Sequence, residues 1–173
     1  MNARIALFAL VLAACGDGSA SSPAPAPAAT ASAKVGYDLR RLRPRNEEKL
    51  ADMFERLRKQ AITDGKLAVV LFSADWCEPC RALDLELGNT AEKSEIGHVR
   101  IFELKEEDWE AATRMDEFSD LRKRWDARAD SYPLFIALDA EGKKIEEMRE
   151  AIDRLGNEGV EPTVPNWLRG LPR

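Results

Sequence analysis

The chain has 173 residues, of which 45% are hydrophobic and 33% charged, and its formal net charge is −5. This length suits one domain of ordinary size and is too short for two large ones. The acidic balance argues against broad nucleic-acid binding, which needs a basic surface. Three cysteines, at positions 15, 77 and 80, are too few for a disulfide-dense scaffold. These features predict a globular protein, and we expect a monomer.

An apolar run opens the chain. Arg4 precedes ten apolar residues, 5–14, which are too few to span a bilayer as a helix because ~20 are needed. Residues 1–14 are therefore predicted to be a signal peptide. The sequence LAAC, which ends at Cys15, resembles the lipobox of bacterial lipoproteins. That resemblance implies a lipid on Cys15 and a place in the cell envelope, facing the periplasm or the outside. The alternative is an ordinary secretory signal that leaves Cys15 free.

A low-complexity segment follows. Of residues 16–34, seventeen of nineteen are Ala, Ser, Pro, Gly or Thr, so the segment has almost nothing to bury. We expect residues 15–36 to be a lipid-anchored tether and residues 37–173 to be the folded domain. Residues 40–45 hold four arginines. They are expected to form a solvated basic arm, with contact to anionic lipid head groups as the alternative.

The first half of the domain alternates helix and strand. Residues 46–62 have apolar residues at helical spacing, with Asn46 as the expected N-cap. Residues 67–74 are a continuous apolar run, which is typical of a strand covered on both faces. A helix is expected over residues 81–87 and a second strand over residues 99–104.

The second half continues in the same way. Residues 108–125 predict one or two helices, with Trp109 and Trp125 as core anchors. Strands are expected over residues 134–138 and 143–148, joined by a turn, and a short helix over residues 163–171. The order predicts an α/β sandwich with a mixed sheet of about four strands flanked by helices.

The chemistry concentrates where the first strand meets the next helix, in the sequence WCEPC. Two residues between Cys77 and Cys80 allow the two sulfurs to meet, and Pro79 stiffens the turn. At a helix N-terminus the dipole and the free N–H groups stabilise a thiolate on Cys77. We expect Cys77 to be the nucleophile and Cys80 to be the thiol that resolves the mixed disulfide.

The sequence FSADWCEPCRAL resembles the strand–WCxxC–helix signature of the thioredoxin-like superfamily, and SYPLFIALDAEG resembles its second signature. The likeness covers about residues 50–148 and is nearest to bacterial envelope members, including the soluble domain of the membrane disulfide reductase. It implies a cis bond between Tyr132 and Pro133, beside the dithiol. It also implies a substrate surface formed by Trp76, Tyr132 and Pro133, with Glu78 and Pro79 in the active-site loop.

One position departs from that family. Thioredoxins carry a buried Asp six residues before the first active-site cysteine, and this chain has Leu71 there. By sequence, the nearest carboxylates that could replace it are Asp75 and Glu78. A carboxylate so close to Cys77 would raise the pKa of its thiol. The alternative is that both are solvated surface groups.

These observations predict a membrane-tethered, extracytoplasmic thiol–disulfide oxidoreductase that acts on protein thiols and disulfides and needs no dissociable cofactor. One alternative is a Cu(I) metallochaperone that binds through Cys77 and Cys80. We expect no metal site, because a structural zinc site needs four ligands and the further candidates are only His98, Met115 and Met148. His98 is expected at the surface. The other alternative is a thioredoxin-like adaptor without catalytic activity.

Overall fold

The computed structural model describes residues 36–45, 47–88, 96–126 and 131–173. These residues belong to one compact unit, Ala33–Arg173. The predicted signal peptide, Cys15, most of the predicted tether and the expected helix cap Asn46 lie outside the described residues. Within the described part of the chain, none of the helices has both the length and the apolar character that a membrane crossing needs.

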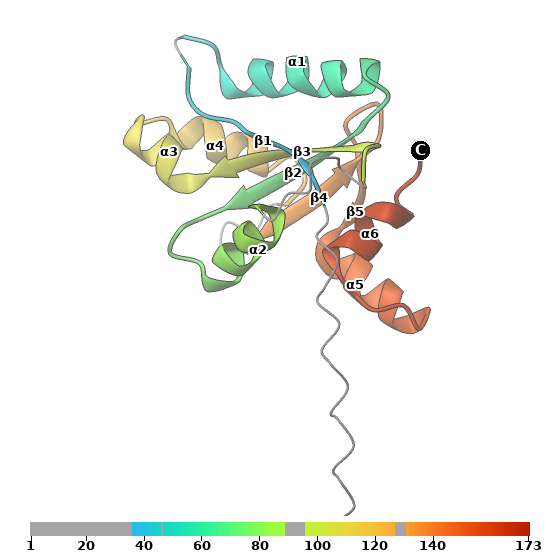
Figure 1. Ribbon diagram of the computed structural model, residues 1–173. Helices are drawn as coiled ribbons and strands as arrows, with labels where there is room; N and C mark the ends of the chain where they lie inside the picture. The colour runs from blue at the N-terminus through green and yellow to red at the C-terminus, as the bar shows by residue number, and fades with distance from the viewer. Residues whose placement is uncertain (1–35, 46, 89–95, 127–130) are drawn as a thin grey trace, which may run out of the picture. The chain divides into compact units, whose positions relative to one another are not determined.

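Strands and helices alternate along the described residues (Figure 1). In chain order they are β1 (Asp38–Arg41), α1 (Leu50–Thr63), β2 (Leu67–Ser73), α2 (Glu78–Gly88), β3 (Val99–Lys105), α3 (Glu106–Ala111), α4 (Met115–Arg122), β4 (Leu134–Leu138), β5 (Lys144–Glu147), α5 (Met148–Asn157) and α6 (Val164–Gly170).

The strands form one mixed sheet in the order β1-β3-β2-β4-β5. β1, β3 and β2 run parallel, whereas β4 is antiparallel to β2 and β5 is antiparallel to β4. The predicted fold class is confirmed, with one more strand than expected within the described residues. The sequence did not reveal β1 because its four residues, DLRR, have no apolar alternation. β1 is held by its pairing with β3 and by ion pairs from Asp38 to Lys66 and Arg100.

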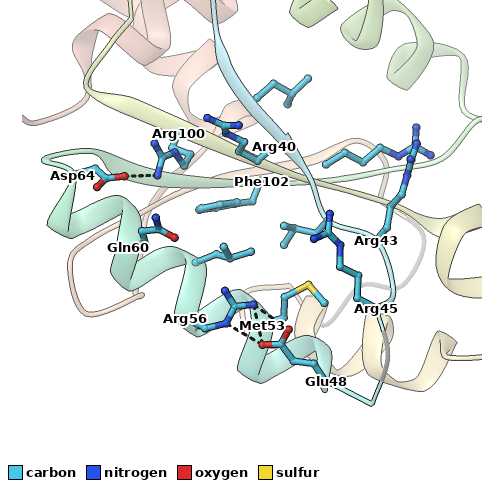
Figure 2. Close-up of a pocket in the computed structure, with 14 residues that line it drawn as sticks. Arg40, Arg43, Arg45, Glu48, Met53, Arg56, Gln60, Asp64, Arg100 and Phe102 are labelled. Atoms are coloured by element: carbon cyan, nitrogen blue, oxygen red, sulfur yellow. Dashed lines mark hydrogen bonds and ion pairs between the residues drawn. The ribbon is translucent and has the colours of Figure 1, made fainter.

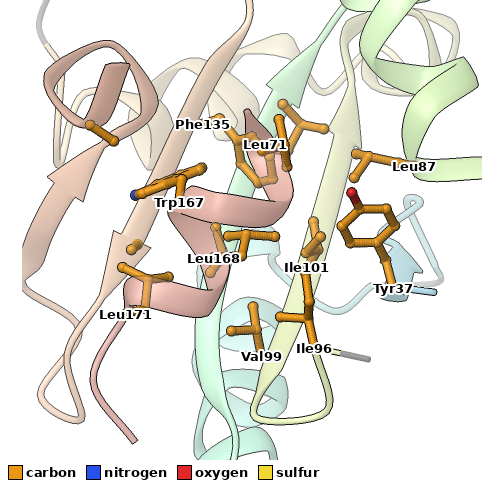
Figure 3. Packing of buried hydrophobic residues seen from close by; sticks show 14 of the residues in the cluster. Tyr37, Leu71, Leu87, Ile96, Val99, Ile101, Phe135, Trp167, Leu168 and Leu171 are labelled. Carbon is orange, nitrogen blue, oxygen red and sulfur yellow. The ribbon is translucent and has the colours of Figure 1, made fainter. Parts of the chain in front are cut away.

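β2 lies at the centre of the sheet, and its residues from Ala68 to Ser73 are buried. This confirms the prediction that the apolar run is a strand covered on both faces. Figure 1 shows α1, α3 and α4 on one side of the sheet and α2, α5 and α6 on the other. Val70 and Phe72 pack toward the first group. Val69 and Leu71 pack toward the second group, where Leu71, Phe135 and Trp167 lie together (Figure 3).

The helices differ from the predicted ones mainly at their ends. α1 begins at Leu50, four residues later than expected, because the Glu117 carboxylate accepts a hydrogen bond from the Leu50 N–H at 2.7 Å and so caps the helix from α4. The segment predicted as one or two helices is two, α3 and α4. They are separated at Thr113, whose φ of 54° ends the first.

The C-terminal segment holds two helices, of which only the second was predicted from the sequence. α5 begins with a capping box between Glu147 and Glu150, and its residues Met148, Ala151 and Leu155 recur at helical spacing and pack on one core. The signal for this helix was therefore present in the sequence, although the helix was not predicted. α6 lies where the terminal helix was predicted. Its cap Thr163 accepts a hydrogen bond from the Asn166 N–H at 3.3 Å.

Candidate functional site

The two cysteines of the WCEPC sequence form a disulfide at the start of α2. β2 ends at Ser73, and the helix begins at Glu78, directly after Cys77. The Cα atoms of the two cysteines are 5.2 Å apart, and the Cys80 N–H donates a hydrogen bond to Cys77 Sγ at 3.2 Å. This confirms the expected place of Cys77 at a helix N-terminus. In the reduced protein, that N–H and the helix dipole stabilise a negative charge on Cys77.

The residues around the disulfide differ widely in their exposure to solvent. Cys77 is 5% exposed and Cys80 1% exposed, whereas the side chain before them, Trp76, is 64% exposed. Glu78 and Pro79, the two residues between the cysteines, are exposed as well. The partial exposure expected for Trp76 is confirmed. An apolar ring on the surface next to a reactive sulfur can serve as a contact for a protein partner.

The segment 131–133 lies against the dithiol. The antiparallel pairing of β2 with β4 sets Phe72 opposite Leu134, so the end of β2 and the start of β4 meet at one edge of the sheet. Tyr132 packs against the cluster of Ala74 and the two cysteines. Its ring meets the Trp76 ring edge to face, with centroids 5.3 Å apart. The cis bond expected between Tyr132 and Pro133 is present.

Tyr132 is held from behind by Arg122, a residue that the sequence analysis did not identify. The Arg122 guanidinium lies 4.4 Å from the centre of the Tyr132 ring, and its Nη2 donates to the Ser131 carbonyl at 2.5 Å. Burial and a contact with the Glu106 carboxylate raise the pKa of the Tyr132 hydroxyl. Tyr132 therefore stays neutral. No local sequence pattern could have identified Arg122, because only the folded chain brings it into contact with Ser131 and Tyr132.

A lysine neutralises the carboxylates next to the cysteines. Lys105 Nζ lies 2.8 Å from Asp75 Oδ1 and 2.5 Å from Asp84 Oδ2. Its hydrogen bond holds the pKa of Asp75 below the usual range. Asp75 is therefore a surface carboxylate, with a side chain 60% exposed, whose charge Lys105 balances. The prediction of a surface group is confirmed, and that of an unbalanced charge beside Cys77 is wrong. The sequence could not reveal this partner, which lies thirty positions away on β3.

A family model for the thioredoxin-like domain matches residues 54–153. The chain belongs to the thioredoxin-like domain family. This thioredoxin-like chain also resembles several solved structures at low identity. A poplar thioredoxin h is 15% identical, over 78% of this chain and 99% of that one, with a TM-score of 0.45. A thioredoxin from Nicotiana alata is 21% identical, over 73% and 94%, with a TM-score of 0.46.

The oxidised C-terminal domain of Neisseria meningitidis DsbD is 18% identical, over 56% of this chain and 80% of that one, with a TM-score of 0.39. No curated protein matches the chain.

The position that departs from the family is buried, as expected: Leu71 is 0% exposed. The parallel register of β2 and β3 sets Glu103 beside it, and Glu103 is only 5% exposed. Burial and the neighbouring Asp84 carboxylate raise the pKa of Glu103 to about 7. Glu103 was not among the site residues predicted from the sequence. The only signal was one charged residue among the apolar ones of a strand.

A cavity of about 770 Å³ opens between β1 and α1, and none of the dithiol-site residues lines it (Figure 2). The four arginines of residues 40–45 lie on its wall. Two further lining residues are neutralised: Arg56 pairs with Glu48 at 2.9 Å, and Arg100 pairs with Asp64 at 2.7 Å. The expected solvated arm is wrong for Arg41, which lies in β1 and binds Asp108 at 2.8 Å.

The other candidates lie away from the dithiol. His98 is half-buried just before β3, so the surface position expected for it is only partly right, and its carbonyl accepts a hydrogen bond from the Leu67 N–H. Met115 packs with the α1-side core and Met148 with the opposite one. Trp109 is fully buried, and Trp125 packs edge to face on Phe54. Both tryptophans are therefore core anchors, as predicted.

Proposed function

We propose that this thioredoxin-like protein is a thiol–disulfide oxidoreductase that exchanges disulfides with protein partners. One observation carries the proposal: a Cys77–Cys80 disulfide stands at the N-terminus of α2, flanked by the exposed ring of Trp76 and by Tyr132. The family supports it at the level of the domain.

The dithiol itself carries two electrons. In the reducing direction, the Cys77 thiolate attacks one sulfur of a substrate disulfide, forms a mixed disulfide and expels the other substrate sulfur as a thiolate. Cys80 then loses its proton and attacks Cys77 Sγ. The Cys77–Cys80 bond forms, and the substrate leaves as a second thiolate. The substrate gains two electrons, so no dissociable cofactor is needed.

A protein substrate suits the surface better than a small thiol. Trp76 supplies apolar contact area. The backbone of Tyr132 and Pro133 precedes β4 at the edge where the dithiol lies, and an extended substrate segment can pair there as a short added strand. Trp76, Tyr132 and Pro133 are accordingly the residues that we propose to contact the substrate.

We further propose that the protein works outside the cytoplasm, tethered by a lipid on Cys15. The support comes from the sequence: an apolar leader, the LAAC box and a segment that has nothing to bury. A lone dithiol in an oxidising compartment can persist as a disulfide, as the redox pair proposed above requires.

The roles of the two cysteines provide the test. In Cys80→Ser the attacking thiol has no resolving partner, so mixed disulfides should accumulate through Cys77, visible as mass-shifted species that a reductant removes. In Cys77→Ser they should not. Equal trapping by both variants would contradict the assignment of Cys77. A wild-type protein without turnover in a disulfide-exchange assay would favour the adaptor instead.

Copper binding is the second arm of the same experiment. Among the described residues there is no group of three or more His, Cys, Asp or Glu side chains arranged to hold a metal. Because the dithiol itself carries the two electrons, the proposal predicts that the reduced protein reduces a protein disulfide without copper. A stoichiometric thiolate–copper absorption band, together with no exchange activity, would replace the oxidoreductase with a metallochaperone.

A further inference from the structure

The resolving thiol is the most enclosed group of the site. Cys80 is 1% exposed, and burial raises the pKa of a thiol. Only the thiolate attacks a disulfide. Resolution of a mixed disulfide therefore needs a group inside the protein that takes the Cys80 proton, a requirement that rests on the function proposed above.

A pair of carboxyl groups lies on the same side of the sheet as Cys80. Cys80 and Asp84 are four residues apart on α2, a spacing that makes side chains neighbours, with about 5–6 Å between Cβ atoms. Asp84 contacts Glu103 of β3. The register places Glu103 beside Leu71, on the face where Leu71 and Ile101 pack against Leu83 and Leu87 of α2. Figure 3 shows Leu71 and Leu87 on this face.

The charges that surround Glu103 come from every neighbouring element. Asp84 faces it from α2, Lys105 from its own strand and Arg41 from β1. Asp75, after β2, binds Lys105, and Asp108 of α3 binds Arg41. Both cations are thus shared with other carboxylates. Burial and Asp84 raise the pKa of Glu103 to about 7, so near neutral pH this carboxyl both binds and releases a proton.

β2 adds an independent sign of a polar site. Ser73 is fully buried and is paired in register with Lys105, two positions from Leu71 on the same sheet face. Within the described part of the chain, its Oγ has no hydrogen-bond partner, and neither does Asp84 Oδ1. A buried hydroxyl that has no hydrogen-bond partner lowers the stability of the folded state. Its presence at position 73 therefore indicates that this part of the sheet face needs a polar side chain.

We propose that the Glu103–Asp84 carboxyl pair is the proton acceptor for Cys80. As Cys80 attacks the mixed disulfide, its proton passes to the pair, the Cys80–Cys77 bond forms and the Cys77–substrate bond breaks, with the electron pair leaving on the substrate sulfur. When the protein is reduced again, Cys80 is the leaving thiolate and the pair returns the proton. The acid thus stands on β3, beside the β2 position that Leu71 occupies.

The first test measures proximity without any protein substrate. In a Cys77→Ser background, the Cys80 thiolate is titrated by its ultraviolet absorbance, with and without Glu103→Gln. A carboxylate near a thiol raises its pKa, so Glu103→Gln should lower the pKa of Cys80 measurably. Glu86→Gln is the matched control on α2, since Glu86 is bound to Tyr37 instead. No shift with Glu103→Gln, or an equal shift with Glu86→Gln, would overturn the proposal.

The second test measures the step. A Cys77–glutathione mixed disulfide is prepared, and release of glutathione by Cys80 is followed from pH 5.5 to 9. The wild type should show an inflection near pH 7, and Glu103→Gln should release at least tenfold more slowly there, recovering as the pH rises. Asp84→Asn serves as the second variant if Glu103→Gln does not fold. An unchanged pH profile would overturn the proposal. Normal glutathione release without exchange on protein disulfides would refute only the proposed function.

Discussion

Leu71 is the residue whose chemistry departs most from what the family resemblance implies. It is fully buried at the centre of β2, paired in register with Glu103 on one side and with Phe135 on the other. The carboxyl group that the resemblance leads one to expect on β2 is replaced by an alkyl side chain, and a carboxyl stands one strand away. Leu71 therefore contributes packing, and the acid is Glu103, whose pKa is raised by burial and by Asp84.

Leu71→Asp should lower the free energy of unfolding by roughly 3–5 kcal/mol at pH 8, because it removes a buried alkyl group and buries a carboxyl beside Glu103. Burial raises the pKa of the new carboxyl in the folded state above its unfolded value of ~3.9. The loss relative to wild type should therefore grow as the pH rises above about 4. Urea unfolding at pH 4 and pH 8 measures this.

Leu71→Asn is the matched control, since it has the same shape as Asp and no charge. Its loss relative to wild type should not depend on pH. A Leu71→Asp variant as stable as the parent would contradict the burial of this position.

The sequence predicted the exposure or burial of some residues near the dithiol, but it did not predict the charged residues that contact them. The exposure of Trp76 and the burial of Leu71 follow from their places before a cysteine and inside an apolar run, and both are confirmed. Arg122 under Tyr132 and Lys105 between two aspartates were not predictable, because each acts on a partner brought close only by the fold. The local sequence therefore identifies the reactive cysteines, but it does not show which charged residues the fold places around them.

At the scale of elements, the start of α1 is set by a contact from another helix. The Glu117 carboxylate of α4 accepts the Leu50 N–H at 2.7 Å and binds Arg114 at 2.8 Å. The hydrogen bond from Arg114, followed by that from Leu50, lowers the pKa of Glu117 from 4.5 to about 2. Because the folded-state pKa is the lower one, the contribution to stability is present above pH 4.5 and disappears as the pH falls toward 2.

Glu117→Gln should therefore lower the free energy of unfolding by about 1–3 kcal/mol at pH 7, since the amide accepts weaker hydrogen bonds from Arg114 and Leu50. The difference from wild type should shrink steadily between pH 4.5 and pH 2. Glu110→Gln, an exposed position on α3, should match wild type throughout. A constant difference over this pH range would show that the charge of Glu117 does not contribute.

Most elements with a strong apolar period were predicted with nearly correct bounds. The prediction for residues 134–138 matches β4, whose five residues are all buried. β1 was missed because it presents few apolar side chains, whereas α5 was missed although Met148, Ala151 and Leu155 recur at helical spacing. β1 is stabilised by backbone pairing and ion pairs, and α5 by a capping box and by packing on β4 and α6. Their stability is a property of the assembled sheet.

α6 completes the core on the face opposite α1. Trp167 is 1% exposed, meets Phe135 edge to face with centroids 5.0 Å apart, and donates from its Nε1 to Glu146 at 3.0 Å. Trp167→Ala should lower the free energy of unfolding by about 3–5 kcal/mol, as measured by chemical denaturation. Trp76→Ala is the matched control. Its ring is 64% exposed, so it should change stability by less than about 0.5 kcal/mol.

The variants Trp76→Ala and Trp167→Ala also distinguish an effect on stability from an effect on substrate binding. Trp76→Ala should slow exchange with a protein disulfide, whereas Trp167→Ala, measured under conditions where it is folded, should not. A large loss of stability in Trp76→Ala would mean that its ring is buried in solution.

At the scale of the whole molecule, the chain combines two kinds of sequence. Residues 16–34 have almost no side chains to bury, whereas the described residues enclose a sheet between two layers of helices. The dithiol is carried entirely by the second part. The contribution of the proposed tether is therefore separable by mutation from the chemistry of the dithiol.

Cys15→Ser should abolish lipidation, because the thioether to the lipid requires the cysteine sulfur. In a bacterial host, the wild type should partition into the detergent phase with a mass above that of the processed chain. Cys15→Ser should be unprocessed, or released in the aqueous phase. The reduction potential of Cys77–Cys80 should be the same in both, since the described fold begins after residue 35. Cys77→Ser is the control and should partition like the wild type. Unchanged mass and partitioning in Cys15→Ser would refute the lipid anchor and leave the proposed exchange chemistry standing.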